Sequence, residues 1–142
     1  MAQFIVDDFH KDMLDALDFE TVREIRKKVV WAGAKVVEKE MSNYIASNHH
    51  ISGDMEKSVS QGPIHEDIDS TWVAVWPQGT DSRGVYNEMK HKIINTGYYN
   101  TFTGKSHRQK DPYVRKMRKQ LEPRIRAVME QQFVICMNEL NK

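Results

Sequence analysis

The residues best placed for chemistry lie in a basic segment of this 142-residue chain. Gly104, Lys105 and Ser106 match the end of a phosphate-binding loop, G-x-x-x-x-G-K-[ST], whose backbone N–H groups wrap the phosphates before the lysine reaches them. That motif requires a glycine at position 99, which is Tyr99, and a helix that follows directly. The next expected helix begins only at Pro112. The sequence therefore predicts no nucleotide site.

The other reactive side chains form no catalytic or metal-binding pattern. His49 and His50 are adjacent, so they point apart on regular structure, and the remaining histidines lack ligand spacing with them. No serine lies in a G-x-S-x-G turn, and the single cysteine, Cys136, lies in an apolar run that predicts a buried side chain. We therefore expect a protein that is not an enzyme and that needs no metal or other cofactor.

The net charge of +1 conceals two oppositely charged segments. Residues 1–24 contain seven acidic side chains against two basic ones, and residues 104–126 contain nine basic side chains against two acidic ones. The basic segment could be the solvated face of a helix, a protein-binding surface, or a track for a nucleic-acid backbone with nearby rings stacking on bases. The side chains we expect at an interface are Asp7, Asp8, Asp12, Asp15, Arg115, Lys116, Arg118 and Lys119.

Localisation follows from features that the sequence lacks. No apolar run approaches the length of a membrane span, and the first residues show no signal-peptide pattern. A single cysteine allows no intrachain disulfide, which suits a reducing compartment. We expect a soluble protein inside a cell, or one assembled there.

A long amphipathic helix is expected near the N-terminus. After a brief helix at 9–17, apolar residues recur at helical spacing from about residue 19 to residue 47, and Asp18 is the expected N-cap. The apolar stripe consists of Val22, Ile25, Val29, Val36, Val37, Met41, Tyr44 and Ile45.

A second long helix should close the chain. It should start at Pro112, with Asp111 as the N-cap, and Pro123 should kink or restart it. Its expected apolar stripe consists of Tyr113, Val114, Met117, Leu121, Ile125, Val128, Met129, Cys136 and Leu140.

The middle of the chain should form a small sheet. Residues 71–77, TWVAVWP, alternate as a strand does, and an earlier strand at about 59–64 should pair with it as a hairpin. Trp72 and Trp76 are expected to be buried between this sheet and the helices. Trp76→Ala would then cost roughly 3–5 kcal/mol.

Shorter elements complete the expected fold. Ser52 should cap a single helical turn, a helix should cover 85–94, and a further strand should follow Gly97. No internal repeat appears, so residues 1–142 should form one domain, in which residues 1–50 are a helical N-terminal part. The predicted class is α+β.

Four short motifs follow one another along the chain. They are a G-x-x-x-x-S turn, a V-x-V-x-P strand, an N-T-G segment and a P-Y-x-R helix start. The residues concerned are Gly53, Met55, Ser58, Val73, Val75, Pro77, Asn95, Thr96, Gly97, Pro112, Tyr113 and Arg115. In this order they resemble the phage and prophage tail-component family, whose members complete tails or join heads to tails in long-tailed phages.

The resemblance covers about residues 53–140, with departures. The family pattern is G-x-L-x-x-S, V-x-V-x-P, E-x-G-T and R-P-F-L-R-P, followed by an amphipathic helix. Here the third motif lacks its glutamate and inverts the Gly-Thr order. The fourth has Asp111 in place of arginine and Lys116 in place of the second proline.

The resemblance implies an α+β fold with long helices on a small, mostly antiparallel sheet. It also implies a non-enzymatic virion component that acts as a ring of identical subunits and contacts tail-tube and connector proteins. Such a protein would be found in the virion and, during assembly, in the host cytoplasm. The alternative is a small DNA-binding accessory protein that uses residues 104–126.

The charge separation bears on the ring. If the acidic and basic segments lie on opposite sides of the subunit, they can meet between neighbours. If they lie together, they pair within one subunit, and both arrangements remain open at this point.

Overall fold

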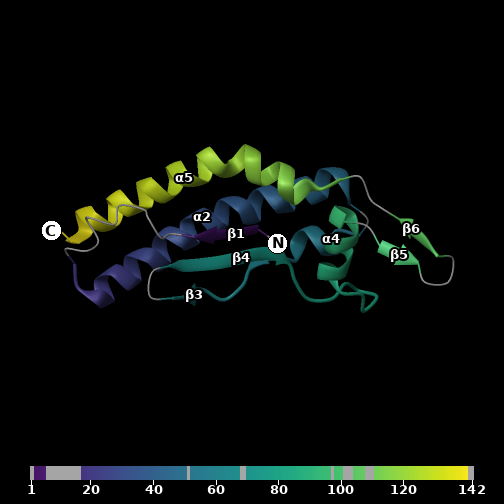
Figure 1. Ribbon diagram of the computed structural model, residues 1–142, viewed down its shortest axis with the longest axis horizontal. Helices are drawn as coiled ribbons and strands as arrows, with labels where there is room; N and C mark the ends of the chain where they lie inside the picture. Colours follow the sequence, from purple (N-terminus) through teal and green to yellow (C-terminus); the bar gives the residue numbers. More distant parts are fainter. Residues whose placement is uncertain are drawn as a thin grey trace.

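The chain has an α+β fold, in which two long helices lie over one face of a small antiparallel sheet (Figure 1). The computed structural model describes residues 2–5, 17–50, 52–67, 70–96, 98–100, 104–107 and 111–140. The elements in chain order are β1 (Ala2–Ile5), α2 (Phe19–Asn48), α3 (Asp54–Lys57), β2 (Val59–Gln61), β3 (His65–Glu66), β4 (Thr71–Pro77), α4 (Asn87–Thr96), β5 (Tyr98–Asn100), β6 (Lys105–His107) and α5 (Tyr113–Leu140).

Helix α2 confirms the prediction of a long N-terminal helix. Asp18 is its N-cap, because its carboxylate accepts a hydrogen bond from the Thr21 N–H at 2.9 Å and satisfies a backbone donor that the first turn leaves free. The helix closes at His49, whose N–H donates to the Ile45 carbonyl at 2.8 Å. The brief helix expected at 9–17 lies outside the described residues, apart from Leu17.

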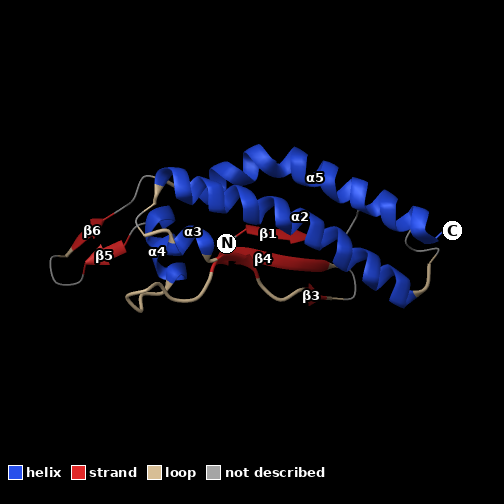
Figure 2. Cartoon of the chain, turned by 180° about the vertical axis from the view of Figure 1, so that it is seen from behind, coloured by secondary structure: helices blue, strands red, loops and turns tan. Residues whose placement is uncertain are grey.

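Helix α5 runs antiparallel to α2 and packs along it (Figures 1 and 2). Gly33 of α2 permits this close approach, since a Cβ there would lie only 3.0 Å from the Met129 sulfur. The predicted apolar stripe of α5 is confirmed along most of the helix, through Met129 and Cys136. Two positions differ from the prediction: Phe133 is buried although the stripe omitted it, and Leu140 is 46% exposed. The side chains that α5 buries are Tyr113, Met117, Leu121, Ile125, Met129, Phe133 and Cys136.

Pro123 does not restart α5, which continues through it as one helix. The ribbon arches over α2 instead of breaking (Figure 1). Proline removes one hydrogen bond of the helix ladder, so a bend is the expected response when both flanking turns remain packed.

Strand β4 is the centre of the sheet. It pairs with β1 on one side and with β2 and β3 on the other, all antiparallel. The expected strand at 71–77 is confirmed, and so is the pairing with the preceding segment. That segment is interrupted between β2 and β3, where the Gly62 N–H still donates to the Ala74 carbonyl at 2.8 Å.

The prediction that Trp72 and Trp76 lie between the sheet and the helices is wrong. Val73 and Val75 face the helices and are completely buried, whereas the two tryptophans are half-buried on the opposite face. Trp72 stacks on His65 at 4.1 Å between ring centroids, and the Trp76 ring lies against Gly62. The 62–66 segment thus covers these rings. Trp76→Ala should accordingly cost less than the roughly 3–5 kcal/mol of a fully buried ring.

The short elements modify two expectations. Gly53, not Ser52, occupies the N-cap position of α3, because the backbone there has a φ of 88° that glycine adopts without strain. The Ser52 hydroxyl, one residue earlier, still takes part in the cap: it accepts from the Asp54 N–H at 3.4 Å and donates to the Asp54 carboxylate at 3.0 Å. Helix α4 lies two residues later than the expected 85–94. The strand expected after Gly97 is confirmed as β5, which pairs with β6 in a hairpin that projects from the body (Figure 1).

Candidate functional site

The first two motifs meet at one end of the sheet. Gly53 is the N-cap of α3, Met55 is a buried residue of that helix, and the Ser58 hydroxyl donates to the Met55 carbonyl at 2.6 Å. The Ser58 carbonyl accepts from the Gln78 N–H at 3.0 Å, next to the buried Pro77 that pairs with Val59. These contacts join the end of α3 to the end of β4.

The third and fourth motifs meet at the start of α5. The Asn95 side-chain oxygen accepts from the Val114 N–H at 3.1 Å, so α4 satisfies a free backbone donor in the first turn of α5. Tyr113 is fully buried and stacks on Tyr44 of α2, with 5.2 Å between ring centroids. Pro112 and Arg115 are exposed, and Gly97 lies outside the described residues.

Asp111 does not act as the N-cap that its position predicts. Its carboxylate accepts from the Tyr44 hydroxyl at 2.9 and 3.0 Å, from the Lys116 ammonium at 3.2 Å, and from the His49 ring. Burial alone would raise the pKa of the Asp111 carboxyl, but these hydrogen bonds outweigh it and hold the pKa below its usual value. The carboxylate therefore ties the start of α5 to the end of α2.

His91 forms the buried centre of this junction. Only 3% of it is exposed, and its Nδ1 contacts the Tyr113 hydroxyl and, at 3.3 Å, the Asn95 amide nitrogen. The Asn95 oxygen is fixed by the Val114 N–H, so the amide presents only N–H groups to the ring. Nδ1 must then be an acceptor, which assigns the neutral ring with its proton on Nε2. Burial lowers the pKa of His91 to about 4.

The predicted basic interface residues share the exposed side of the first turns of α5. They are Arg115, Lys116, Arg118 and Lys119. Part of the basic charge in this segment is paired within the subunit, because Lys116 contacts Asp111 and the Arg124 guanidinium donates to Glu40 at 2.9 Å. The acidic residues expected to face them, Asp7, Asp8, Asp12 and Asp15, lie outside the described residues. Their placement relative to α5 stays a prediction.

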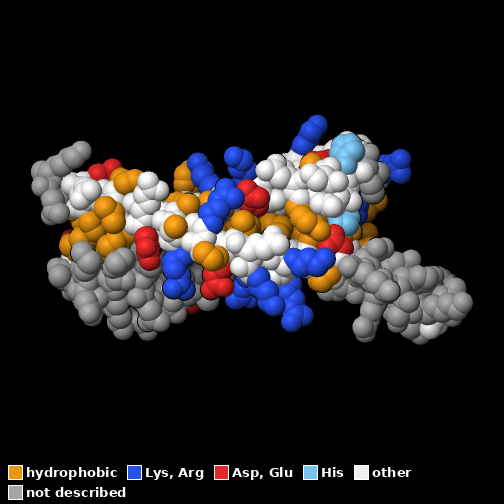
Figure 3. All heavy atoms as spheres, turned by 90° about the horizontal axis from the view of Figure 1, so that it is seen from above, with side chains coloured by type: hydrophobic (Ala, Val, Ile, Leu, Met, Phe, Trp, Pro, Cys, Tyr) orange, Lys and Arg blue, Asp and Glu red, His pale blue; other side chains and the backbone are white. Residues whose placement is uncertain are grey.

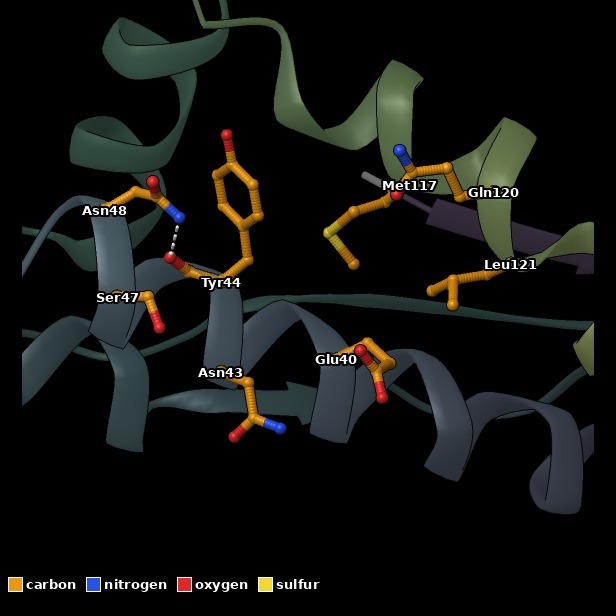
Figure 4. Close-up of a pocket in the computed structure, with 8 residues that line it drawn as sticks. All are labelled: Glu40, Asn43, Tyr44, Ser47, Asn48, Met117, Gln120 and Leu121. Carbon is orange, nitrogen blue, oxygen red and sulfur yellow. Dashed lines mark hydrogen bonds between the residues drawn. The ribbon is translucent and has the colours of Figure 1, made fainter.

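A shallow groove of about 210 Å³ separates α2 from α5. Figure 4 shows Met117 and Leu121 reaching from α5 toward α2, and the Asn48 amide donating to the Tyr44 carbonyl at 3.1 Å. Its lining residues are Glu40, Asn43, Tyr44, Ser47, Asn48, Met117, Gln120 and Leu121. Three amides, two hydroxyls and the Glu40 carboxylate give this groove hydrogen-bonding capacity. The Glu40 carboxylate accepts from the Arg124 guanidinium at 2.9 Å.

A second hollow of about 160 Å³ lies at the motif junction, between α3 and α4. Its walls are mainly apolar, from Met55, Ile93 and Ile94. Glu56 also lines it and is buried, with one carboxylate oxygen 2.6 Å from the His50 ring. The hollow follows from the packing of two short helices.

Other site classes find no support in the described part of the chain. Its residues include no group of three or more His, Cys, Asp or Glu side chains that could hold a metal ion. None of its helices combines the length and apolar character that a bilayer-spanning segment requires. Cys136 is buried, as its apolar surroundings predict.

Comparison with known proteins gives no match: no protein-family model, no curated protein and no solved structure is significantly similar to this chain.

Sequence reasoning named Asn95 and Tyr113 as motif residues, but it missed His91 and the contacts that hold the junction. His91 and Asn95 lie four residues apart on α4 and so share one face, which was the available signal. Nothing in the local sequence indicates that this face meets Tyr113. The contact between Tyr44 and Asp111 spans 67 residues of chain and has no local signal at all.

Proposed function

We propose that this protein is a structural component of a phage virion that acts in tail completion or head–tail joining as a ring of identical subunits. The observation that carries the proposal is the role of the motif residues. Ser58, Asn95 and Tyr113 join secondary-structure elements to one another. A signature made of such contacts serves architecture, which is what a tail component requires.

The overall shape supports the same proposal. The molecule is elongated, and the β5–β6 hairpin extends beyond the helices at one end (Figure 1). A projecting hairpin of this kind can reach an adjacent subunit in a ring. The proposed partners are further copies of the chain, tail-tube proteins and connector proteins, in the virion and in the host cytoplasm during assembly.

The first experiment measures the mass of the purified chain by sedimentation velocity and images it by electron microscopy. Closed rings of one size are the expected result. A chain that stays monomeric at every concentration, alone and with tail-tube protein, contradicts the proposal.

A second measurement separates this proposal from DNA binding through residues 104–126. Backbone contacts to DNA release counterions, so any such binding should be weak and lost by about 150 mM salt. Submicromolar binding to a short duplex at that salt concentration would favour the DNA-binding alternative.

The charge separation supplies a third test. Reversal of the four basic residues should weaken self-association and leave the monomer folded, because a heterologous contact loses its charge complementarity. Reversal of the acidic residues in the same chain should partly restore association. The basic set is Arg115→Glu, Lys116→Glu, Arg118→Glu and Lys119→Glu, and the acidic set is Asp7→Lys, Asp8→Lys, Asp12→Lys and Asp15→Lys. Unchanged oligomer mass in the first variant, or no recovery in the second, removes this idea.

A further inference from the structure

The β5–β6 hairpin is a two-stranded sheet that projects from one end of the molecule (Figures 1 and 2). Tyr98 lies opposite His107 and Asn100 lies opposite Lys105, and among the described strands β5 and β6 pair only with each other. An isolated two-stranded hairpin is only marginally stable in water, and a third strand or a packing surface is needed to hold it. The hairpin is therefore suited to join the edge of another sheet.

Strand β1 gives the main sheet such an edge. Among the described strands it pairs only with β4, from Ala2 opposite Val75 to Ile5 opposite Trp72. Its four consecutive paired residues, AQFI, include no charged residue and no proline. A regular edge of this kind can pair with a strand from another chain.

The hydrogen bonds of β4 show which backbone groups of β1 point outward. The Gly62 N–H donates to the Ala74 carbonyl, so the N–H and C=O of Ala74 point toward β2, and those of its two neighbours in β4 point toward β1. Phe4 lies opposite Val73, and its backbone groups therefore point toward β4. Gln3 lies opposite Ala74, so its N–H and C=O point away from β4, as the addition of a strand to this edge requires.

The opposite edge of the sheet is less suited to a further strand. Strands β2 and β3 have three and two residues, and a segment that contains Gly62 and Pro63 separates them. Proline lacks the N–H that a ladder requires, and short, interrupted edges are a common protection against strand addition. Of the two edges, β1 is thus the one that can accept a strand.

Charge also matches the hairpin to β1. Residues 95–110 carry Lys105, Arg108 and Lys110 and no acidic residue, whereas residues 1–10 carry Asp7 and Asp8 and no lysine or arginine. Opposite charges beside two surfaces steer and orient their contact. Lys and Arg side chains lie along the middle of the molecule seen from above, so contact between two such faces would bring like charges together (Figure 3).

We propose that the β5–β6 hairpin of one copy adds to the β1 edge of a second copy and extends its sheet. This inference rests on the proposed function, because it names the surfaces through which the subunits of the ring meet. The outward N–H and C=O groups of β1 bond to a strand of the neighbour's hairpin. The contact joins two unlike surfaces, so it is heterologous and closes into a ring when the rotation between copies allows it.

A proline on β1 tests the edge in the full-length chain. Gln3→Pro removes the outward N–H of residue 3 and none of the hydrogen bonds to β4, and proline is tolerated on edge strands. Self-association should weaken by about tenfold or more in sedimentation velocity, because the added strand loses a backbone hydrogen bond. Gln3→Val is the matched control: it keeps the N–H and favours a strand, so it should retain the wild-type mass.

A shortened chain tests the hairpin. Tyr98 lies opposite His107, so the two ends of the hairpin are about 5 Å apart, and a linker of about three residues can replace residues 98–107. The hydrogen bond from the Val114 N–H to the Asn95 side chain, at 3.1 Å, should hold α4 against α5 without the hairpin. This shortened chain should be monomeric when it is alone.

A mixture of the two defective chains is the decisive measurement. The Gln3→Pro chain keeps its hairpin, and the shortened chain keeps its β1 edge. An equal mixture should therefore form species of two chains and none larger. Circular dichroism spectra should show that each variant is folded, and the comparison of Gln3→Pro with Gln3→Val decides the question even if the shortened chain does not fold.

The outcomes distinguish this inference from the proposed function. A folded shortened chain that still self-associates alone, or a mixture that forms no species of two chains, overturns the inference although self-association stands. If Gln3→Pro keeps the mass of an oligomeric wild type, the subunits meet elsewhere and only the inference is overturned. A wild-type chain that remains monomeric at every concentration, alone and with tail-tube protein, overturns the ring as well.

Discussion

Gly62 lies against the Trp76 ring, and its replacement by alanine should destabilise the protein. A Cβ at Gly62 would lie 2.6 Å from both Cη2 and Cζ3 of the Trp76 indole, far inside normal contact distance. The indole is rigid, and the Gly62 N–H is held by the Ala74 carbonyl at 2.8 Å. Neither group can retreat without loss of a contact, so the clash must displace β2, β3 or the ring.

The expected cost follows from two opposing effects. An extra methyl group in a packed site typically costs about 1–3 kcal/mol. Alanine also restricts the unfolded chain, which offsets about 0.4–1 kcal/mol of that cost. The φ angle of Gly62 lies outside the left-handed region, so the backbone itself accepts alanine without strain. Gly62→Ala should therefore lower the free energy of unfolding by about 1–2 kcal/mol.

Urea unfolding of a double-mutant cycle provides the measurement. In a Trp76→Val background the clash disappears, and Gly62→Ala should then be neutral or slightly stabilising. A coupling close to zero between the two changes, or a Gly62→Ala protein as stable as the wild type, would refute the packing of Trp76 on the 62–66 segment.

Two further predictions concern the helix contact and the buried histidine. Gly33→Ala should change the free energy of unfolding by less than about 1 kcal/mol, because the gain in helix propensity offsets the cost of displacing the flexible end of the Met129 side chain. The larger Gly33→Val should lower the free energy of unfolding by about 1–3 kcal/mol in the same urea assay. Burial lowers the pKa of His91 from 6.5 to about 4, so its contribution to stability is complete above pH 6.5 and is lost as the pH falls toward 4. Urea titrations across this range should show a loss on the order of 3 kcal/mol that His91→Gln removes. The hydrogen bond from Lys90 lowers the pKa of Asp81 from 3.8 to about 2, so its contribution is lost only at lower pH and does not obscure the histidine.

The long helices could be predicted because their signals are local. Apolar residues at helical spacing define α2, and the carboxylate of Asp18 caps the helix by accepting from the Thr21 N–H three residues later. The sequence therefore places the start of α2 correctly. The same reasoning places the start of α5 within one residue. The burial of Phe133 and the exposure of Leu140 were not predicted, because the face that a long helix buries changes with the curvature of the helix and with the length of its partner.

The orientation of β4 could not be predicted from alternation alone. The pattern assigns Trp72 and Trp76 to one face and Val73 and Val75 to the other, which is correct. It does not say which face the helices cover. Two tertiary contacts decide which face of β4 the helices cover. Helix α2 packs on the smaller valines, and Gly62 lies against the larger ring of Trp76 on the other face.

The junction of α2, α4 and α5 shows why motif residues predict architecture more readily than chemistry here. A capping rule examines the residues next to a helix start, and it selects Asp111. In the structure Asn95, which lies 19 residues before Val114, accepts from the Val114 N–H in the first turn of α5, and the Asp111 carboxylate binds the Tyr44 hydroxyl instead. Asn95 replaces Asp111 as the capping residue because the contact between His91 and Tyr113 buries the start of α5 and brings α4 against it. The motifs thus mark where elements meet, while the surface available to a partner depends on what those contacts leave exposed. For α5 that remainder is a first half with six basic side chains and a second half with two acidic and no basic side chains.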